Sequence, residues 1–176
     1  LLRANLSAGE EQIRLSQELD MLDSYLYIQN TAKKGVLHLV KEISEPDVLE
    51  YLVPKFLLQP VVENAIVHGL VQNPLSGTIT LSIQAVGHTL HLIVSDTGQG
   101  MTLDTLDALR HRIRAVEPPR TDGKHGFGLW STAARLRLQY DDKADISIDS
   151  QEGQGTTVHI WLPVQRERRT QDAKQG

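Results

Sequence analysis

Residues 59–69 read Gln-Pro-Val-Val-Glu-Asn-Ala-Ile-Val-His-Gly and have the pattern of an amphipathic helix. Pro60 suits the first turn, where a backbone N–H has no helical partner. At about 100° per residue, the apolar side chains share one face, while Glu63, Asn64 and His68 share the other with one valine as the exception. These three offer a base, a neutral oxygen ligand and a donor that can face a phosphate. Because Mg²⁺ takes few protein ligands when phosphates and waters complete its shell, a single Asn can suffice.

Three glycine motifs follow this helix. Asp96-Thr97-Gly98-Gln99-Gly100-Met101 comes directly after a predicted strand, where two glycines allow a tight turn and close backbone approach to a ligand. His125-Gly126-Phe127-Gly128-Leu129 opens a predicted helix, and a helix N-terminus suits a phosphate because its free N–H groups point outward. Gly153-Gln154-Gly155-Thr156-Thr157 opens the last predicted strand. Each motif alone is typical of an ordinary turn, so their order along the chain carries the interpretation.

Hydrophobic periodicity predicts the remaining elements. Helices are expected at 8–31, from Pro54 and Pro60 to Gly69, at 102–116 and at 129–140, and strands at 36–43, 78–86, 89–95, 146–149 and 156–162. The glycine-containing turns at 87–88 and 153–155 predict two hairpins. The fold class is therefore α+β, a two-layer sandwich with helices over one face of a mixed sheet.

Composition restricts the function classes. The formal net charge is −4, and the one dense basic run, Arg166, Arg168 and Arg169, is interleaved with Glu167, so we interpret it as a solvated end and expect no nucleic-acid partner. The absence of cysteine excludes disulfides and thiolate zinc sites. No apolar run reaches the length of about 18 residues that a membrane span needs, so we expect a soluble chain without membrane contact of its own. No P-loop, dinucleotide or common hydrolase motif is present.

The order of the four motifs resembles the N, G1, G2 and G3 elements of the GHKL ATPases, which share the Bergerat fold, over about residues 54–163. Within that superfamily, Gln59-Pro60, the Glu63-to-Gly69 segment and the preceding LDMLDSYLYIQ of residues 19–29 resemble the LytS/YesM-like bacterial sensor histidine kinases. The resemblance implies a mostly antiparallel sheet, an ATP site between the helices and a lid, and a protein-histidine kinase that uses ATP and Mg²⁺.

The resemblance also implies roles for single residues. Asn64 would coordinate Mg²⁺, Glu63 would be the catalytic base, and His68 would face the phosphates. Asp96 would accept a hydrogen bond from the adenine amino group, an interaction worth roughly 1.5 to 3 kcal/mol that guanine, with a carbonyl there, could not make. The resemblance implies three further groups of nucleotide-binding residues. Gly98, Gly100 and Met101 would surround the adenine ring, and Thr156 would support Asp96. Gly126, Gly128 and Leu129 would lie beneath a mobile lid at about 102–125.

The chain departs from the family pattern in three respects. Relatives usually follow G-x-G-L with one residue and then Asn, where this chain has Trp130-Ser131-Thr132, and this affects the expected lid and phosphate contacts. The aromatic or Arg-Phe pair that usually follows the first helix is absent from residues 31–35. None of the seven histidines has the context of the family's phosphoacceptor, which is followed by an aromatic residue and Asn.

The resemblance and the abrupt start of the chain, without an initiator Met, together predict a fragment of a longer protein. We expect an N-terminal helical segment at 1–35 that leads to a missing dimerisation and phosphoacceptor region, a catalytic domain at 36–163, and a polar disordered tail at 164–176. The implied partners are that upstream region, a response regulator and a second copy in a full-length homodimer. The implied location is a cytoplasmic domain of a protein attached to the inner membrane of a bacterium.

Two other functions remain open. An anti-sigma-factor serine kinase has a compact GHKL domain with a similar Asn-Ala and His-Gly pair, although the long leading helix and Gln59-Pro60 speak against it. A nucleotide-sensing regulatory module that transfers no phosphate is compatible with the altered residues after Gly128.

Overall fold

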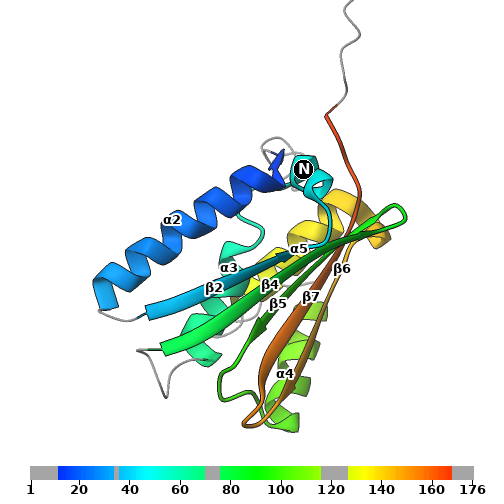
Figure 1. Cartoon of the computed structure of the whole chain (residues 1–176). Helices are drawn as coiled ribbons and strands as arrows, with labels where there is room; N and C mark the ends of the chain where they lie inside the picture. Colours follow the sequence, from blue (N-terminus) through cyan, green and yellow to red (C-terminus); the bar gives the residue numbers. More distant parts are fainter. Residues whose placement is uncertain (1–11, 34–35, 70–75, 116–126, 168–176) are drawn as a thin grey trace, which may run out of the picture.

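The computed structural model describes residues 12–33, 36–69, 76–115 and 127–167, which form two layers (Figure 1). The larger sheet has five strands in the order β2-β4-β5-β7-β6. These are β2 (Val36–Ile43), β4 (Ser76–Val86), β5 (Thr89–Asp96), β6 (Asp145–Gln151) and β7 (Gly155–Pro163). β2 pairs with β4 in parallel, and the other neighbours are antiparallel. The predicted mixed, mostly antiparallel sheet is confirmed.

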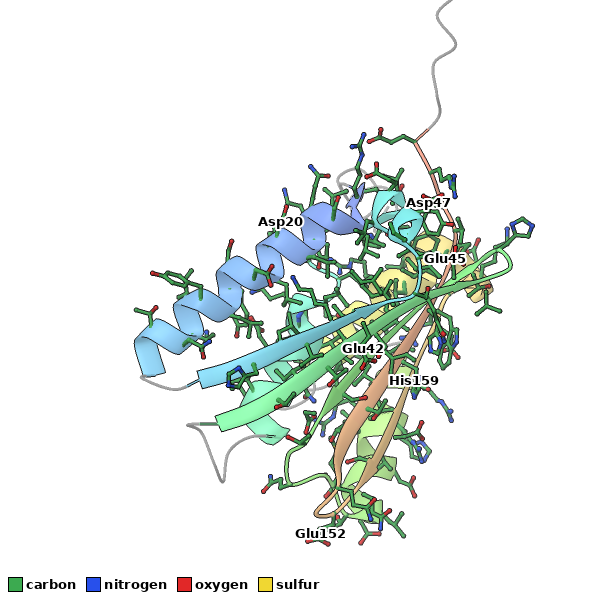
Figure 2. All side chains as sticks on the ribbon, in the orientation of Figure 1. Asp20, Glu42, Glu45, Asp47, Glu152 and His159 are labelled. Carbon is green, nitrogen blue, oxygen red and sulfur yellow. The ribbon has the colours of Figure 1, made fainter. Side chains whose placement is uncertain are left out.

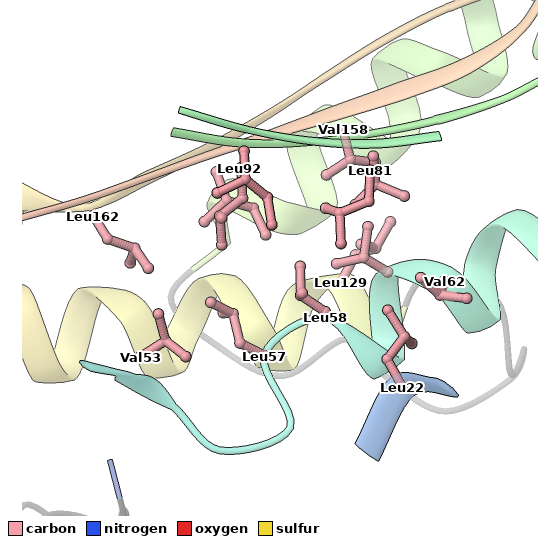
Figure 3. Close-up of a cluster of buried hydrophobic side chains, with 14 of the residues drawn as sticks. Leu22, Val53, Leu57, Leu58, Val62, Leu81, Leu92, Leu129, Val158 and Leu162 are labelled. Atoms are coloured by element: carbon pink, nitrogen blue, oxygen red, sulfur yellow. The ribbon is translucent and has the colours of Figure 1, made fainter. Parts of the chain in front are cut away.

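Helices α2 (Leu15–Lys33), α3 (Gln59–Asn64) and α5 (Phe127–Tyr140) cover one face of this sheet, and α4 (Leu103–Arg114) packs against α5 and β6 (Figure 1). Strand alternation explains the arrangement, because successive side chains point to opposite faces. Along β5, Leu90, Leu92 and Val94 are buried and the residues between them are only partly so. Figure 3 shows Leu92 and Leu81 of the sheet facing Leu58 and Leu129 of the helical layer.

The first helix begins later than predicted. We expected it from residue 8, but residues 8–11 lie outside the described residues and Gln12–Arg14 form a short strand, β1. β1 pairs antiparallel with β3 (Leu52–Pro54), with Ile13 opposite Val53. Helix α2 then starts at Leu15, whose N–H donates to the Tyr51 carbonyl at 2.8 Å. Its residues Leu15, Leu19, Leu22 and Leu26 join the same core as the sheet.

The second helical region also differs from its prediction. Residues 52–54 are a strand, and Phe56 has a φ of 58°, so the α-helix begins only at Gln59, with Pro60 in its first turn as expected. After Asn64 the chain continues as a π-helix over Ala65–Gly69. The spacing of about 100° per residue therefore holds only to Asn64, because a π-helix bonds i to i+5. Val67, the apolar residue on the predicted polar face, is 50% exposed.

The segment after Pro163 is only partly described. We expected a disordered tail from residue 164, but Leu52 N–H donates to the Gln165 carbonyl at 2.8 Å and Gln12 Nε2 donates to Gln165 Oε1 at 2.6 Å. Arg166 also lies over the Tyr51 ring. Residues 164–167 are thus part of the folded body, since backbone groups of β3 bond to them, and residues 168–176 lie outside the described residues. No helix in the described ranges has the length and apolar character needed to cross a membrane.

Candidate functional site

A cavity of about 850 Å³ lies among the end of α3, helix α4 and two turns of the sheet. This volume is within the range of small-molecule and cofactor sites. Figure 2 shows Glu152 in the turn between β6 and β7, at the end of the sheet next to α4. The lining residues are Asn64, Gln99, Gly100, Met101, Thr102, Asp104, Thr105, Ala108, Leu109, Arg112, Glu152, Gly153 and Thr156. Four of the predicted site residues, Asn64, Gly100, Met101 and Thr156, are therefore brought together.

The turn after β5 and the turn between β6 and β7 are held together backbone to backbone. Gly153 N–H donates to the Gln99 carbonyl at 2.6 Å. Gly100 has a φ of 65°, and a Cβ there would run into the Gln151 carbonyl. Gly155 has a φ of 90°, and a Cβ there would run into the Asp96 carbonyl. These glycines are required both by their left-handed backbone and by the closeness of the two turns.

Asp96 ends β5 and is only 6% exposed. Its Oδ1 accepts a hydrogen bond from Gly98 N–H at 2.8 Å, and its backbone lies opposite Thr156 in the β5–β7 ladder. Burial raises the pKa of Asp96, and the N–H groups of Gly98 and Thr156 oppose that rise. The result is a desolvated carboxyl group held in a fixed direction beside the cavity.

Thr156 is fixed by neighbours of its own. Its hydroxyl lies 2.9 Å from the Ser150 hydroxyl, and Ser150 also donates to the Gly155 carbonyl at 2.9 Å. Like Asp96, Thr156 is 6% exposed. Thr156 is therefore held by these contacts, pairs with Asp96 in the β5–β7 ladder and lines the cavity.

On α3, Glu63 and Asn64 are half-buried. Gln59 Nε2 donates to Glu63 Oε1 at 2.9 Å, one turn earlier on the same helix. The pKa of Tyr25 on α2 is raised to about 12, mainly by burial and to a lesser extent by the nearby Glu63 carboxylate. Glu63 therefore lies within electrostatic range of α2 and is held by its own helix, while the adjacent Asn64 reaches the cavity.

This geometry can be compared with that of known proteins. The family model described as histidine kinase-, DNA gyrase B- and HSP90-like ATPase matches residues 54–166. The chain belongs to this ATPase family. The match covers α3, the cavity and both glycine turns, and it confirms the predicted GHKL relationship.

The relatives are sensor histidine kinases. An uncharacterised sensor-like histidine kinase of Staphylococcus epidermidis is 32% identical over 164 residues, which cover 93% of this chain and 31% of the relative. The sensor protein kinase HptS of Staphylococcus aureus is 31% identical over 166 residues, which cover 94% of this chain and 31% of the relative. The chain thus spans under a third of the length of these curated relatives.

Solved structures show the same fold. The catalytic domain of the histidine kinase ThkA superposes with a TM-score of 0.61 at 15% identity, over 87% of this chain and 94% of that one. The Acinetobacter baumannii histidine kinase AdeS gives a TM-score of 0.62 at 15% identity, over 92% of this chain and 72% of that one. The fold of this ATPase-family member is therefore that of histidine kinase catalytic domains.

Several predicted site residues of this ATPase domain do not line the cavity. Glu63, Asp96 and Gly98 lie beside it, on α3 or in the turn after β5. Gly128 packs against Pro60, where an added Cβ would lie 3.3 Å from the Pro60 Cβ. Leu129 is 1% exposed and belongs to the core. Gly126 and the side chain of His68 lie outside the described residues.

The sequence prediction missed the contribution of α4. We expected a helix at 102–116 within a mobile lid at about 102–125, and residues 103–114 do form a helix. It buries Leu106 and Ile113 and presents Leu109 and Arg112 to the cavity, a contribution that was not predicted. Leu109 and Arg112 are three residues apart and therefore lie on one face of the helix. This spacing was the signal in the sequence that could have predicted their shared position. Residues 116–126 lie outside the described residues.

Whether this site suits a divalent cation depends on the metal ligands that its residues offer. Within the described residues, no group of three or more His, Cys, Asp or Glu side chains could hold a metal ion. Asn64 does offer a neutral oxygen in the cavity, and Mg²⁺ is commonly held by one or two protein groups plus phosphates and waters. The donor set therefore fits a nucleotide-bound Mg²⁺ and does not fit a cation held by protein alone.

Proposed function

We propose that this ATPase domain binds Mg-ATP in the cavity and presents the γ-phosphate to a histidine outside residues 1–176. The observation that carries the proposal is that one cavity is lined both by Asn64 of α3 and by Gly100 and Thr156 of the two glycine turns. A side-chain amide whose oxygen suits Mg²⁺ thus lines the same cavity as the turns that hold the buried carboxyl group of Asp96.

In the proposed complex, Asp96 accepts a hydrogen bond from the adenine amino group, and Thr156 supports it. Asn64 would hold a nucleotide-bound Mg²⁺, which would supply charge neutralisation at the phosphates. Glu63 is the base that takes the proton from the attacking imidazole, oriented by Gln59. Transfer then depends on positioning and on electrostatic stabilisation, with little covalent chemistry by this domain.

Calorimetry on the 176-residue chain tests nucleotide binding. We expect Mg-ATP to bind, Asn64→Ala to remove most of the Mg²⁺ dependence, and Asp96→Asn to remove the preference for adenine. Absence of adenine nucleotide binding at millimolar concentration would overturn the proposal.

We further propose that the whole protein is a dimeric, membrane-attached kinase of a bacterial two-component system that passes its phosphate to a response regulator. The sensor-kinase names of the relatives support this, and the chain covers only 31% of their length. Incubation of a longer protein with γ-labelled ATP tests it, since we expect acid-labile label on a histidine. Label on serine would favour the anti-sigma-factor kinase, and binding without label would favour the nucleotide-sensing module.

A further inference from the structure

A buried carboxylate on α2 holds the segment that leads into α3. Glu18 is 2% exposed. Its Oε2 accepts a hydrogen bond from Phe56 N–H at 2.9 Å, and its Oε1 accepts one from Leu58 N–H at 2.8 Å. Both oxygens are thus used, and they fix two backbone donors of one short segment in defined directions.

The carbonyl groups of the same segment are held by an arginine of α5. Arg135 of α5 donates from Nη1 to the Lys55 carbonyl and from Nη2 to the Phe56 carbonyl, each at 3.0 Å. The planar guanidinium makes such a paired contact in a single orientation. Phe56 keeps a φ of 58°, a left-handed conformation that a bulky residue adopts only when its surroundings impose it.

This arrangement, the Glu18–Arg135 clamp, lies directly before the functional helix. Leu58 is the N-cap residue of α3, and α3 together with the π-helix that continues it spans only residues 59–69, with Asn64 at the junction. So short a helix contributes little intrinsic stability, so its position depends on what holds its ends. The clamp holds its N-terminal end through one residue of α2 and one residue of α5.

A carboxylate buried at this position has to be compensated by hydrogen bonds. Its two oxygens provide that compensation, and an apolar side chain of similar volume would leave the Phe56 and Leu58 N–H groups without their acceptor. What Glu18 adds is direction, because its two oxygens fix the register of the Phe56 and Leu58 amides. Direction matters where α3 must hold Asn64 at a fixed place in the cavity.

We infer that Glu18 and Arg135 are positioning residues that set α3, and with it Asn64, for metal-dependent nucleotide binding, and that Glu18 passes movements of α2 to that helix. The inference rests on the proposed function, because it concerns the same site. α2 precedes α3 in the chain, and a shift of this helix would pull on the Phe56 and Leu58 amides through the two hydrogen bonds to Glu18.

Two measurements on Glu18→Gln test the clamp in the 176-residue chain. Hydrogen exchange of the amides of residues 61–66 needs no nucleotide, and we expect it to be faster by about tenfold, while exchange in β4 and β5 stays unchanged. Calorimetry gives the ratio of ATP affinity with Mg²⁺ to that in EDTA, and we expect this ratio to fall by about tenfold, which corresponds to about 1.4 kcal/mol. Arg135→Lys, which cannot span both carbonyls, should act in the same direction and keeps the test available if Glu18→Gln does not fold.

Asp23→Asn is the matched control. It removes the 2.6 Å ion pair between Asp23 and Lys41, which joins α2 to β2 and not to α3. We expect neither α3 exchange nor the Mg²⁺ ratio to change in this variant. Unchanged α3 exchange in folded Glu18→Gln would overturn the clamp, and so would equal losses of affinity with and without Mg²⁺. Failure of the unmodified chain to bind ATP would overturn the proposed function instead, and α3 exchange would still decide the positioning role.

Discussion

Gln59 and Glu63 are joined by a 2.9 Å hydrogen bond from Gln59 Nε2 to Glu63 Oε1, within a single turn of α3. If Glu63 is the base for phosphoryl transfer, this bond orients its carboxylate. We expect Gln59→Leu to lower phosphorylation of histidine by roughly tenfold to a hundredfold, because a misplaced catalytic group loses much of its effect. ATP affinity should change less than twofold. Single-turnover phosphorylation of a longer protein measures the first quantity, and an unchanged rate would contradict the role of Gln59.

Asp96 predicts a pH dependence of nucleotide affinity. Burial raises the pKa of Asp96 above its ordinary value of 3.8, so the carboxylate takes up a proton at a higher pH than an exposed one. Protonation removes the charge-assisted hydrogen bond to adenine, so ATP affinity should fall as the pH falls towards that raised pKa. Asp96→Asn should lose affinity by roughly tenfold or more at neutral pH and should lack this pH dependence. Calorimetry across pH measures both, with GTP as the control ligand. Equal affinity of the unmodified chain for ATP and GTP would be incompatible with base reading by Asp96.

The sequence predicted the sheet well because its signal is local. Strand alternation and the two glycine turns placed β4, β5 and β7 within two residues of their observed ends. The parallel pairing of β2 with β4 was expected only as part of a mixed sheet, because no local pattern specifies which distant strands pair. The order of the motifs also predicted which turns meet at the cavity. Gly100 and Gly155 lie where the main chains of these two turns approach closely, so any other residue there would displace main chain.

The parts that the sequence did not predict depend on tertiary contacts. Glu18 reads as an ordinary polar residue in a helical pattern, and only the fold shows that it is buried beneath Phe56 and Leu58. The π-helix after Asn64 has no sequence signature of its own. The packing of α4 was hidden by its polar composition, and the family resemblance implied a lid there, although Leu106 and Ile113 are only 3% exposed.

A comparison of Gly155 with Gly87 tests the close approach of the turn after β5 to the turn between β6 and β7. Both have positive φ, 90° and 61°, but an added Cβ at Gly155 would meet the Asp96 carbonyl, whereas nothing lies within 4 Å at Gly87. We expect Gly87→Ala to cost about 1 kcal/mol of unfolding free energy from φ alone. Gly155→Ala should cost clearly more, on the order of 3 kcal/mol, and should weaken ATP binding because Asp96 must shift. Urea unfolding measures the loss of unfolding free energy, and calorimetry measures the ATP affinity. Equal losses of unfolding free energy in both variants would contradict the close approach of the two turns.

His91 predicts a stability change at mildly acidic pH. Its Nε2 lies 3.1 Å from His159 Nδ1, and burial together with His159 lowers the pKa of His91 below 6.5. The unfolded chain therefore binds this proton first, so the contribution to stability is complete above pH 6.5 and is lost as the pH falls through the lowered folded pKa. His91→Phe keeps a ring beside Trp161 and should show a smaller loss of thermal midpoint between pH 7.5 and pH 5.5. His88→Gln, in the exposed turn, is the control and should behave like the unmodified chain.

Trp130 stands where the family pattern differs, and the structure gives it a specific contact. Its Nε1 donates to the Ala115 carbonyl at 2.9 Å, at the C-terminal end of α4. Arg137 donates to the same carbonyl at 3.3 Å and to the Ile113 carbonyl at 2.9 Å. α5 therefore satisfies the free carbonyl groups at the end of the helix that lines one side of the cavity.

Trp130→Phe keeps an aromatic ring beside Phe127 but removes this donor. One hydrogen bond contributes about 0.5 to 1.5 kcal/mol, so we expect exchange of the amides of residues 112–115 to be faster by roughly two- to tenfold. ATP affinity should fall by no more than the same factor, because Arg112 and Leu109 reach the cavity from this part of α4. Trp161→Phe, on the face of the sheet away from α4, is the matched control and should leave both quantities unchanged. Unchanged exchange at residues 112–115 in Trp130→Phe would mean that Arg137 alone holds the end of α4.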